Sequence, residues 1–136
     1  MNTETKKVLI LDDDSDMRIF LSNLLEADGF SPVIAENSHE GLLKAMKERP
    51  DLIILDVPMP EKKGIQIHQD LKHDKRFKDI PVIMISPLDK KTLQQYQRTI
   101  KGYNDQDMPS PEAYLKKPLE AEELLALVRK FVTRKT

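Results

Sequence analysis

The chain has 136 residues, the length of one ordinary domain, and its 22 Lys and Arg nearly balance its 23 Asp and Glu, leaving a formal charge of −1. It lacks the basic excess of a typical nucleic-acid-binding protein, so we expect no nucleic-acid partner. The absence of cysteine excludes disulfides, thiolate zinc sites and cysteine nucleophiles. Apolar runs of at most about five residues are too short to span a membrane. With no signal-peptide pattern either, we expect a cytoplasmic protein without a membrane partner.

Short continuous apolar runs recur along the chain, and each is too short for a helix and lacks polar alternation. Such runs are typical of strands that are buried on both faces of a parallel sheet. The predicted strands cover residues 8–11, 32–35, 52–55, 81–85 and 113–115.

A stretch with helical periodicity follows each predicted strand. The first has its apolar residues on one stripe, namely Met17, Phe20, Leu21, Leu24 and Leu25. Asp14 or Ser15 can cap this helix, and Gly29 can end it. The second begins with Ser38 as its cap and stops at Pro50.

The remaining helices are predicted around residues 64–71, from the region of Leu93 to near Gly102, and from about residue 119 to residue 132. The residues expected to face the core are Leu42, Leu43 and Met46 in the second helix, Leu93, Tyr96, Ile100 and Tyr103 in the fourth, and Leu124, Leu125, Val128 and Phe131 in the fifth.

Five strands that are each followed by a helix predict an α/β fold, because right-handed crossovers make the sheet parallel and place helices on both of its faces. At this length we expect the flavodoxin-like doubly wound (βα)5 arrangement, with strand order 2-1-3-4-5. Sites in such folds lie at the carboxyl ends of the strands.

Polar residues follow four of the predicted strands. They are Asp12, Asp13 and Asp14 after the first strand, Asp56 after the third, Ser86 after the fourth and Lys117 after the fifth. Two carboxylates about 4 Å apart repel by roughly 4 kcal/mol at an effective dielectric constant near 20, so this cluster favours a bound cation. Oxygen ligands alone favour Mg²⁺. With such an ion, Asp56 is a plausible nucleophile toward a phosphoryl group, which Lys117 and Ser86 would contact.

The motifs LILDDDSDMR, LIILDVPMPEKKG, PVIMIS and YLKKP occur in this order and resemble those of bacterial response-regulator receiver domains. The resemblance runs from Lys7 to about Val132. It implies one stand-alone receiver domain over residues 1–136, similar to chemotaxis regulators and without an output domain. Such a protein works in two-component phosphorelay signalling as a phosphoacceptor, and not as an enzyme that turns over a substrate.

The resemblance also implies the metal site and the phosphoacceptor. Asp56 would accept the phosphoryl group and form an aspartyl phosphate. Mg²⁺ would be held by Asp12, Asp13 and Asp56, together with the backbone carbonyl of Pro58. Gly64 would allow the third helix to begin close to the acceptor loop.

The switch residues follow from the same resemblance. Ser86 matches the hydroxyl switch position, Tyr114 the aromatic switch position, and Lys117 the lysine of the Lys-Pro pair. The Lys117–Pro118 peptide is expected to be cis.

The implied partners are a sensor histidine kinase or a histidine phosphotransfer protein, which would donate the phosphoryl group. An unknown downstream protein would bind the face formed by the fourth helix, the fifth strand and the fifth helix. The protein itself would be a monomer or a weak dimer.

The sequence departs from the family pattern at three places. Pro58 and Leu88 cannot hydrogen-bond an attacking water, which predicts slow self-dephosphorylation. Pro87 removes a backbone donor next to Ser86 and stiffens the loop that should move on activation. Residues 104–111, with the sequence NDQDMPSP, predict a lengthened and exposed loop before the fifth strand.

Two other functions remain open. The first is a receiver-like interaction scaffold that is not phosphorylated, which Pro87 favours slightly. The second is a small phosphatase of the haloacid-dehalogenase type, because Asp12 and Asp14 have the Asp-x-Asp spacing of that family. Asp16 stands where that family has Thr or Val, and this reading gives Asp56 no role.

The histidines predict no metal site. His39, His68 and His73 share no metal-ligand spacing, so we expect each of them at the surface of a helix or loop.

Overall fold

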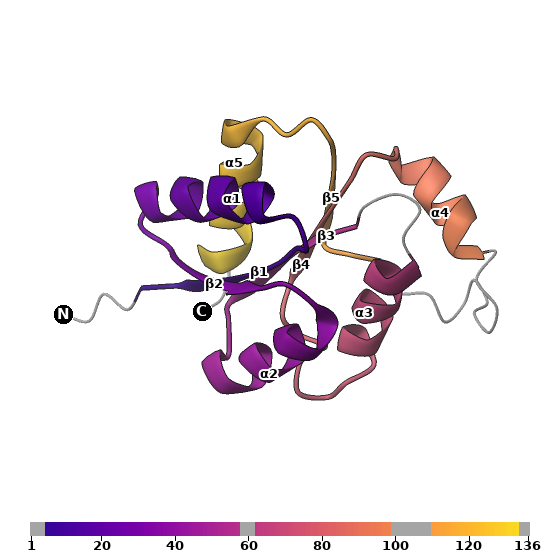
Figure 1. Cartoon of the computed structure of the whole chain (residues 1–136), viewed down its shortest axis with the longest axis horizontal. Coiled ribbons are helices and arrows are strands. Elements are labelled where there is room, and N and C mark those ends of the chain that lie inside the picture. The colour runs from indigo at the N-terminus through magenta and orange to yellow at the C-terminus, as the bar shows by residue number, and fades with distance from the viewer. Residues whose placement is uncertain (1–4, 58–61, 99–109, 134–136) are drawn as a thin grey trace.

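The sheet has the predicted topology. The computed structural model of the chain describes residues 5–57, 62–98 and 110–133. Within these segments, five parallel strands form one sheet in the order β2-β1-β3-β4-β5 (Figure 1), which confirms the flavodoxin-like arrangement. The strands are β1 Lys7–Leu11, β2 Ser31–Ala35, β3 Leu52–Asp56, β4 Val82–Ser86 and β5 Ala113–Lys116.

A helix follows each strand in the described part of the chain. The helices are α1 Ser15–Ala27, α2 Ser38–Glu48, α3 Lys62–Lys72, α4 Lys90–Arg98 and α5 Ala121–Thr133. Figure 1 shows α1 and α5 on one face of the sheet and α2 and α3 on the other. None of the helices in the described segments is long and apolar enough to cross a membrane.

The alternation of side chains along the strands produces two apolar layers. In β3, Ile54 packs in the layer that contains Leu21 of α1 and Val128 of α5. Its neighbour Leu55 packs in the opposite layer, with Ile65 of α3. The central strands are therefore covered on both faces, and their carboxyl ends lie at one edge of the two layers.

The edge strands are less buried than predicted. All residues of β3 and β4 are buried, whereas β2 is only partly buried except at Ala35, and Ala113 and Tyr114 of β5 are only partly buried. The prediction that every strand is buried on both faces is thus wrong for β2 and β5. Each of them has a strand neighbour on one side only and lies at the border of the helical layers.

The first helix begins as predicted but buries a narrower stripe. The Asp14 side chain, one of the two predicted caps, accepts a hydrogen bond from the Asp16 N–H at 3.0 Å. Gly29 follows the helix with φ of +91°, a conformation that glycine adopts without strain. Leu21 and Leu25 face the sheet, whereas Phe20 is 43% exposed, so its predicted inward position is wrong.

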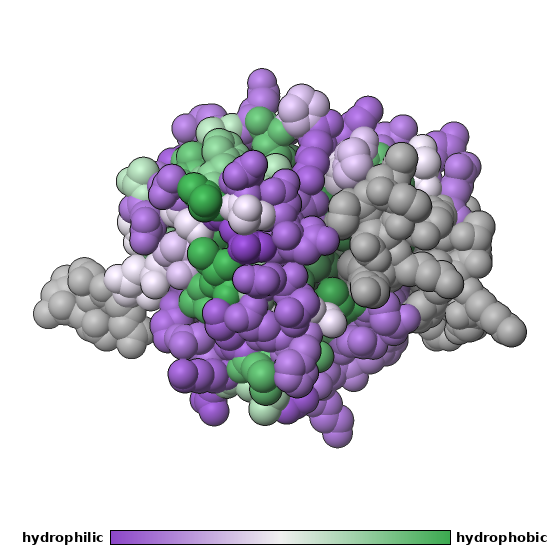
Figure 2. Space-filling model, viewed as in Figure 1, coloured by the Kyte–Doolittle hydropathy of each residue, from purple (hydrophilic) through white to green (hydrophobic). Residues whose placement is uncertain are grey.

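The second helix presents a different face to the sheet from the one predicted. Its cap is Asn37 and not Ser38, since the Asn37 side chain accepts from the Glu40 N–H at 2.8 Å. Gly41 and Ala45 are buried, whereas Leu43 and Met46 are exposed. Figure 2 shows apolar patches over α1 and α2 among hydrophilic side chains.

The small residues in α2 allow a close approach to β1. A Cβ atom added to Gly41 would overlap the side chain of Leu11. Leu43 and Met46 therefore turn outward, whereas Leu42 is partly buried and packs against the apolar cluster, as predicted.

Helices α3 and α5 agree with the predicted positions to within about two residues, and α4 contains Leu93, as predicted. The four predicted inward residues of α5 are buried, as is Leu93 of α4. Ile100, Gly102, Tyr103 and most of the predicted loop at residues 104–111 lie outside the described residues, as does the side chain of Tyr96.

Candidate functional site

Two buried carboxylates meet at the carboxyl ends of adjacent strands. Leu11 of β1 pairs with Leu55 of β3, so the next residues, Asp12 and Asp56, come side by side. Asp12 is 2% exposed and Asp56 5% exposed. Their carboxyl groups lie close enough to interact with each other. The structure thus brings together two of the aspartates that the sequence placed in one site.

The electrostatics of this pair favour the neutral form of Asp12. Burial, together with the neighbouring Asp56 carboxyl and its negative charge, raises the pKa of Asp12 to about 8. The Asp14 N–H, which donates to Asp12 Oδ1 at 2.9 Å, and the positive charge of Lys117 oppose this rise. Asp12 therefore keeps its proton near neutral pH, as expected where like charges share a site.

Lys117 provides the cation of the site. Its Nζ atom lies 2.7 Å from Oδ2 of Asp56, whose side chain is wholly buried. The backbone N–H of Lys117 donates to the Ser86 carbonyl at 2.8 Å, which attaches the end of β5 to the end of β4. The Lys117–Pro118 peptide is cis, as predicted.

The donor set fits a hard cation. Oδ2 of Asp12 and Oδ1 of Asp56 are buried and have no hydrogen-bond partner. Carboxylate oxygens without a hydrogen-bond partner on two neighbouring side chains are the kind of ligand that Mg²⁺ prefers. A bound cation would also displace the proton that Asp12 keeps.

The other predicted ligands are not assembled around this pair. Asp13 is exposed, and in residues 5–57, 62–98 and 110–133 no three carboxylate or imidazole side chains are grouped as metal ligands. Pro58 lies outside the described residues. The metal-binding roles of Asp13 and of the Pro58 carbonyl therefore remain predictions.

Ser86 and Tyr114 are connected through the loop between β4 and α4. Ser86 is buried at the end of β4, and its Oγ accepts from the Leu88 N–H at 3.1 Å. The Tyr114 hydroxyl donates to the Leu88 carbonyl. Burial raises the pKa of Tyr114, and a hydrogen bond with Ser86 opposes the rise. The Leu88 N–H thus bonds to Ser86 across the exposed Pro87, which has no donor of its own.

Arg18 is a residue of the site that the sequence reasoning missed. Its Nη1 donates to the backbone carbonyl of Asp12 at 2.8 Å, and its Nη2 lies 3.8 Å from the Glu36 carboxylate. Arg18 therefore fixes the backbone that carries Asp12. The sequence feature that could have indicated this role is the position of Arg18 in the first turn of α1, four residues after the cap and close to Asp12.

His68 lies where it was not expected. His39 and His73 are exposed, as predicted, but His68 is wholly buried. Both of its ring nitrogens lack a hydrogen-bond partner. Burial, aided by the charge of Lys72 and opposed by that of Glu112, lowers the pKa of His68 to about 4. The surface prediction was wrong because His68 stands three residues from both Ile65 and Leu71, on the buried face of α3.

Comparison with known sequences shows one family over nearly the whole chain. The family model for the response regulator receiver domain matches residues 8–129. The DNA-binding dual master transcriptional regulator RpaA of Synechocystis is 35% identical over 128 residues, which are 94% of this chain and 49% of RpaA. The polar-differentiation response regulator DivK of Brucella anthropi is 29% identical over 93% of this chain and 96% of its own length. The chain thus spans about half the length of RpaA.

Solved structures have the same fold. The chemotaxis protein CheY4 of Vibrio cholerae matches with a TM-score of 0.76 and 26% identity, over 94% of this chain and 99% of CheY4. The receiver domain of the Francisella response regulator 1452 matches with a TM-score of 0.77 and 26% identity, over 97% and 100% of the two chains.

Proposed function

The chain belongs to the response regulator receiver domain family, and from this premise we propose that Asp56 accepts a phosphoryl group from a phosphohistidine. The donor would be a sensor histidine kinase or a histidine phosphotransfer protein. One observation carries the proposal. Asp56 is a buried carboxylate with Oδ2 held by Lys117 at 2.7 Å and Oδ1 without a hydrogen-bond partner.

The residues at the strand ends have distinct roles in this proposal. Asp12 and Asp56 would hold Mg²⁺, with Asp13 and the Pro58 carbonyl as the further ligands that the family pattern implies. Mg²⁺ supplies positive charge that neutralises the carboxylates and the phosphoryl oxygens. Arg18 keeps the backbone of Asp12 in place through its 2.8 Å hydrogen bond.

The transfer is a direct displacement at phosphorus. An Asp56 oxygen forms a bond to phosphorus while the bond between phosphorus and the histidine nitrogen breaks, and the electron pair stays on that nitrogen. Lys117 balances the charge of the phosphoryl oxygens, and the Ser86 hydroxyl donates a hydrogen bond to one of them. The protein assists only its own phosphorylation and dephosphorylation.

The signal would leave the site through the loop after β4. Ser86 Oγ accepts from the Leu88 N–H, and the Leu88 carbonyl accepts from Tyr114. A phosphoryl group that draws Ser86 toward Asp56 removes the first of these bonds and so acts on the second. The output is a changed surface on α4, β5 and α5 for a downstream protein.

Intact mass measurement tests the proposal. With Mg²⁺ and acetyl phosphate, the protein should gain the mass of one phosphoryl group, and Asp56→Asn should gain none. Asp70→Asn serves as a control, because Asp70 is exposed and bonds only to Gln66 of its own helix. If no adduct forms with acetyl phosphate or with a phosphorylated donor protein, the protein is an unphosphorylated scaffold.

The phosphatase alternative makes a different prediction. It needs a free Asp14, but the Asp14 carboxylate caps α1 through the Asp16 N–H. Steady hydrolysis of p-nitrophenyl phosphate that is lost in Asp12→Asn and kept in Asp56→Asn would support a phosphatase.

A further inference from the structure

A cavity lies at the opposite end of β3 from Asp56. Its volume is about 500 Å³, and Pro50 and Asp51, directly before β3, and Ile80, shortly before β4, contribute to its lining. The volume lies within the range of about 300–1,000 Å³ of sites for small organic ligands. The proposed phosphoacceptor site contains none of the lining residues.

Apolar side chains form much of the cavity wall. Met46 comes from α2, and Phe77 and Ile80 come from the segment between α3 and β4. The Arg76 guanidinium lies 4.9 Å from the centre of the Phe77 ring. It also binds both carboxylate oxygens of Asp74, at 3.0 and 2.7 Å. Arg76 is thus held in one orientation and adds a flat surface to the wall.

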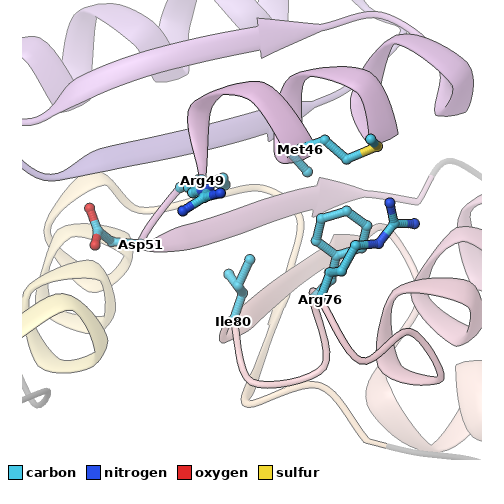
Figure 3. Close-up of a pocket in the computed structure, with 8 residues that line it drawn as sticks. Met46, Arg49, Asp51, Arg76 and Ile80 are labelled. Atoms are coloured by element: carbon cyan, nitrogen blue, oxygen red, sulfur yellow. The ribbon is translucent and has the colours of Figure 1, made fainter.

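Arg49 supplies a cation that the fold leaves uncompensated. Figure 3 shows Arg49 at the end of α2, across the cavity from Arg76 and Ile80. Its φ is 50°, a left-handed conformation in which glycine is favoured. Within the described residues, the exposed Arg49 side chain forms no hydrogen bond or ion pair. An arginine in a strained backbone conformation, directed at a cavity and without an anion, indicates a ligand.

Arg49 is the group of the lining that favours an anion. The cavity is lined by the guanidinium groups of Arg49 and Arg76 and by the Asp51 carboxylate, and the ion pair with Asp74 already balances the charge of Arg76. The Asp51 carboxylate is already engaged, since its Oδ2 accepts from the Lys7 N–H at 2.9 Å. We propose that this cavity binds a small organic anion, with a flat apolar body on Met46, Phe77 and Ile80 and a carboxylate or phosphate group on Arg49.

Two probes of the same shape test the role of charge. The full-length protein labelled with ¹⁵N is titrated with 2-naphthoate and, separately, with the neutral 2-naphthalenemethanol, without Mg²⁺ or a phosphodonor. We expect 2-naphthoate to shift the amide signals of Met46, Arg49, Phe77 and Ile80. It should bind about tenfold more tightly than the alcohol, the factor that corresponds to one charge-assisted hydrogen bond. Shifts elsewhere only, or equal affinities, would overturn the proposal.

Variants at one position separate the charge from the fold. Arg49→Gly removes the guanidinium and also relieves the backbone, so it should fold and lose the preference for the anion. Arg49→Lys keeps a positive charge and should retain part of the preference. Lys47→Gln, at an exposed position on α2 outside the lining, should leave the affinity unchanged. A loss of affinity in Lys47→Gln equal to that in Arg49→Gly would show non-specific attraction and refute the site.

The test is independent of phosphorylation. Asp56→Asn should bind 2-naphthoate as the natural sequence does, because Asp56 does not line the cavity. The proposal for the anion site is therefore tested by the Arg49 variants, and the proposal for the phosphoacceptor is tested separately by Asp56→Asn.

Discussion

The Nζ atom of Lys117 lies 2.7 Å from Oδ2 of Asp56, and this ion pair joins a partly exposed ammonium group to a carboxylate side chain that is wholly buried. Removal of the lysine leaves a buried charge with no compensating cation, which is more costly than the loss of an exposed ion pair.

We therefore expect Lys117→Met to lower the free energy of unfolding by about 2 kcal/mol at pH 7 in the absence of Mg²⁺. In the Asp56→Asn background, where no charge remains to be paired, the same substitution should cost less than about 1 kcal/mol. Urea denaturation of the natural sequence, the two single variants and the double variant gives the coupling energy between Lys117 and Asp56 directly. Equal costs in the two backgrounds would show that the ion pair does not stabilise the fold.

The position of Leu88 predicts a long-lived aspartyl phosphate. Its side chain packs against the apolar cluster on the α2 and α3 side, and it has no polar group that could orient a water for attack. Leu88→Gln should shorten the phosphoryl lifetime severalfold, because an amide can position that water. Loss of the adduct mass with time measures the rate. A natural sequence that loses its phosphoryl group as fast as Leu88→Gln contradicts this prediction.

His68 predicts a loss of stability in mild acid. Its pKa is about 4 in the folded state against 6.5 ordinarily, so the unfolded state binds more protons between these values. Stability is then lost as the pH falls below 6.5. From pH 7 to pH 5.5 the loss should be about 1 kcal/mol. Lys72 of α3 and Glu112 before β5 are the charged groups that act on the ring.

The control for this effect is His68→Leu, which fits a buried apolar position and cannot be protonated. Thermal unfolding at the two pH values should show a smaller difference for His68→Leu than for the natural sequence. His73→Leu, at an exposed position, should keep the full difference. The same pH dependence in all three proteins would assign it to other groups.

Gly41 predicts a packing defect between α2 and β1. Gly41→Ala places a Cβ atom on the Leu11 side chain, and the resulting overlap should destabilise the protein by about 1–2 kcal/mol. Lys47→Ala, on the exposed side of the same helix, should change stability by less than about 0.5 kcal/mol. Urea midpoints compare the two. A neutral Gly41→Ala would mean that Leu11 moves aside without cost.

The positions and order of the strands could be predicted because a strand covered on both faces needs an unbroken apolar run, as Leu52 to Leu55 has. The face of α2 could not be predicted from periodicity. Leu43 and Met46 form an apolar pattern, but the short distance between α2 and β1 admits only Gly41 and Ala45. That distance is set by the packing of the whole molecule and cannot be read from the sequence of the helix alone.

The candidate site also has features that could be predicted from the sequence and features that could not. The topology of the strands was sufficient to predict that Asp12, Asp56 and Lys117 come together, because parallel strands end at one edge of the sheet. The raised pKa of Asp12 depends on its burial and on its contact with Asp56, and neither can be read from the spacing of the residues. Arg18 binds a backbone carbonyl, and this interaction leaves no side-chain pattern in the sequence.

Strand β3 has the cavity beside its first residue and Asp56 as its last, and at about 3.3 Å per residue the strand is roughly 17 Å long. Any coupling between the two ends obeys thermodynamic reciprocity. If phosphorylation changes the affinity for 2-naphthoate by some factor, bound naphthoate must change the equilibrium for phosphorylation by the same factor. Comparing the affinity for 2-naphthoate of the phosphorylated and the unphosphorylated protein therefore measures how strongly a small molecule bound at one end of β3 can regulate phosphorylation at the other end.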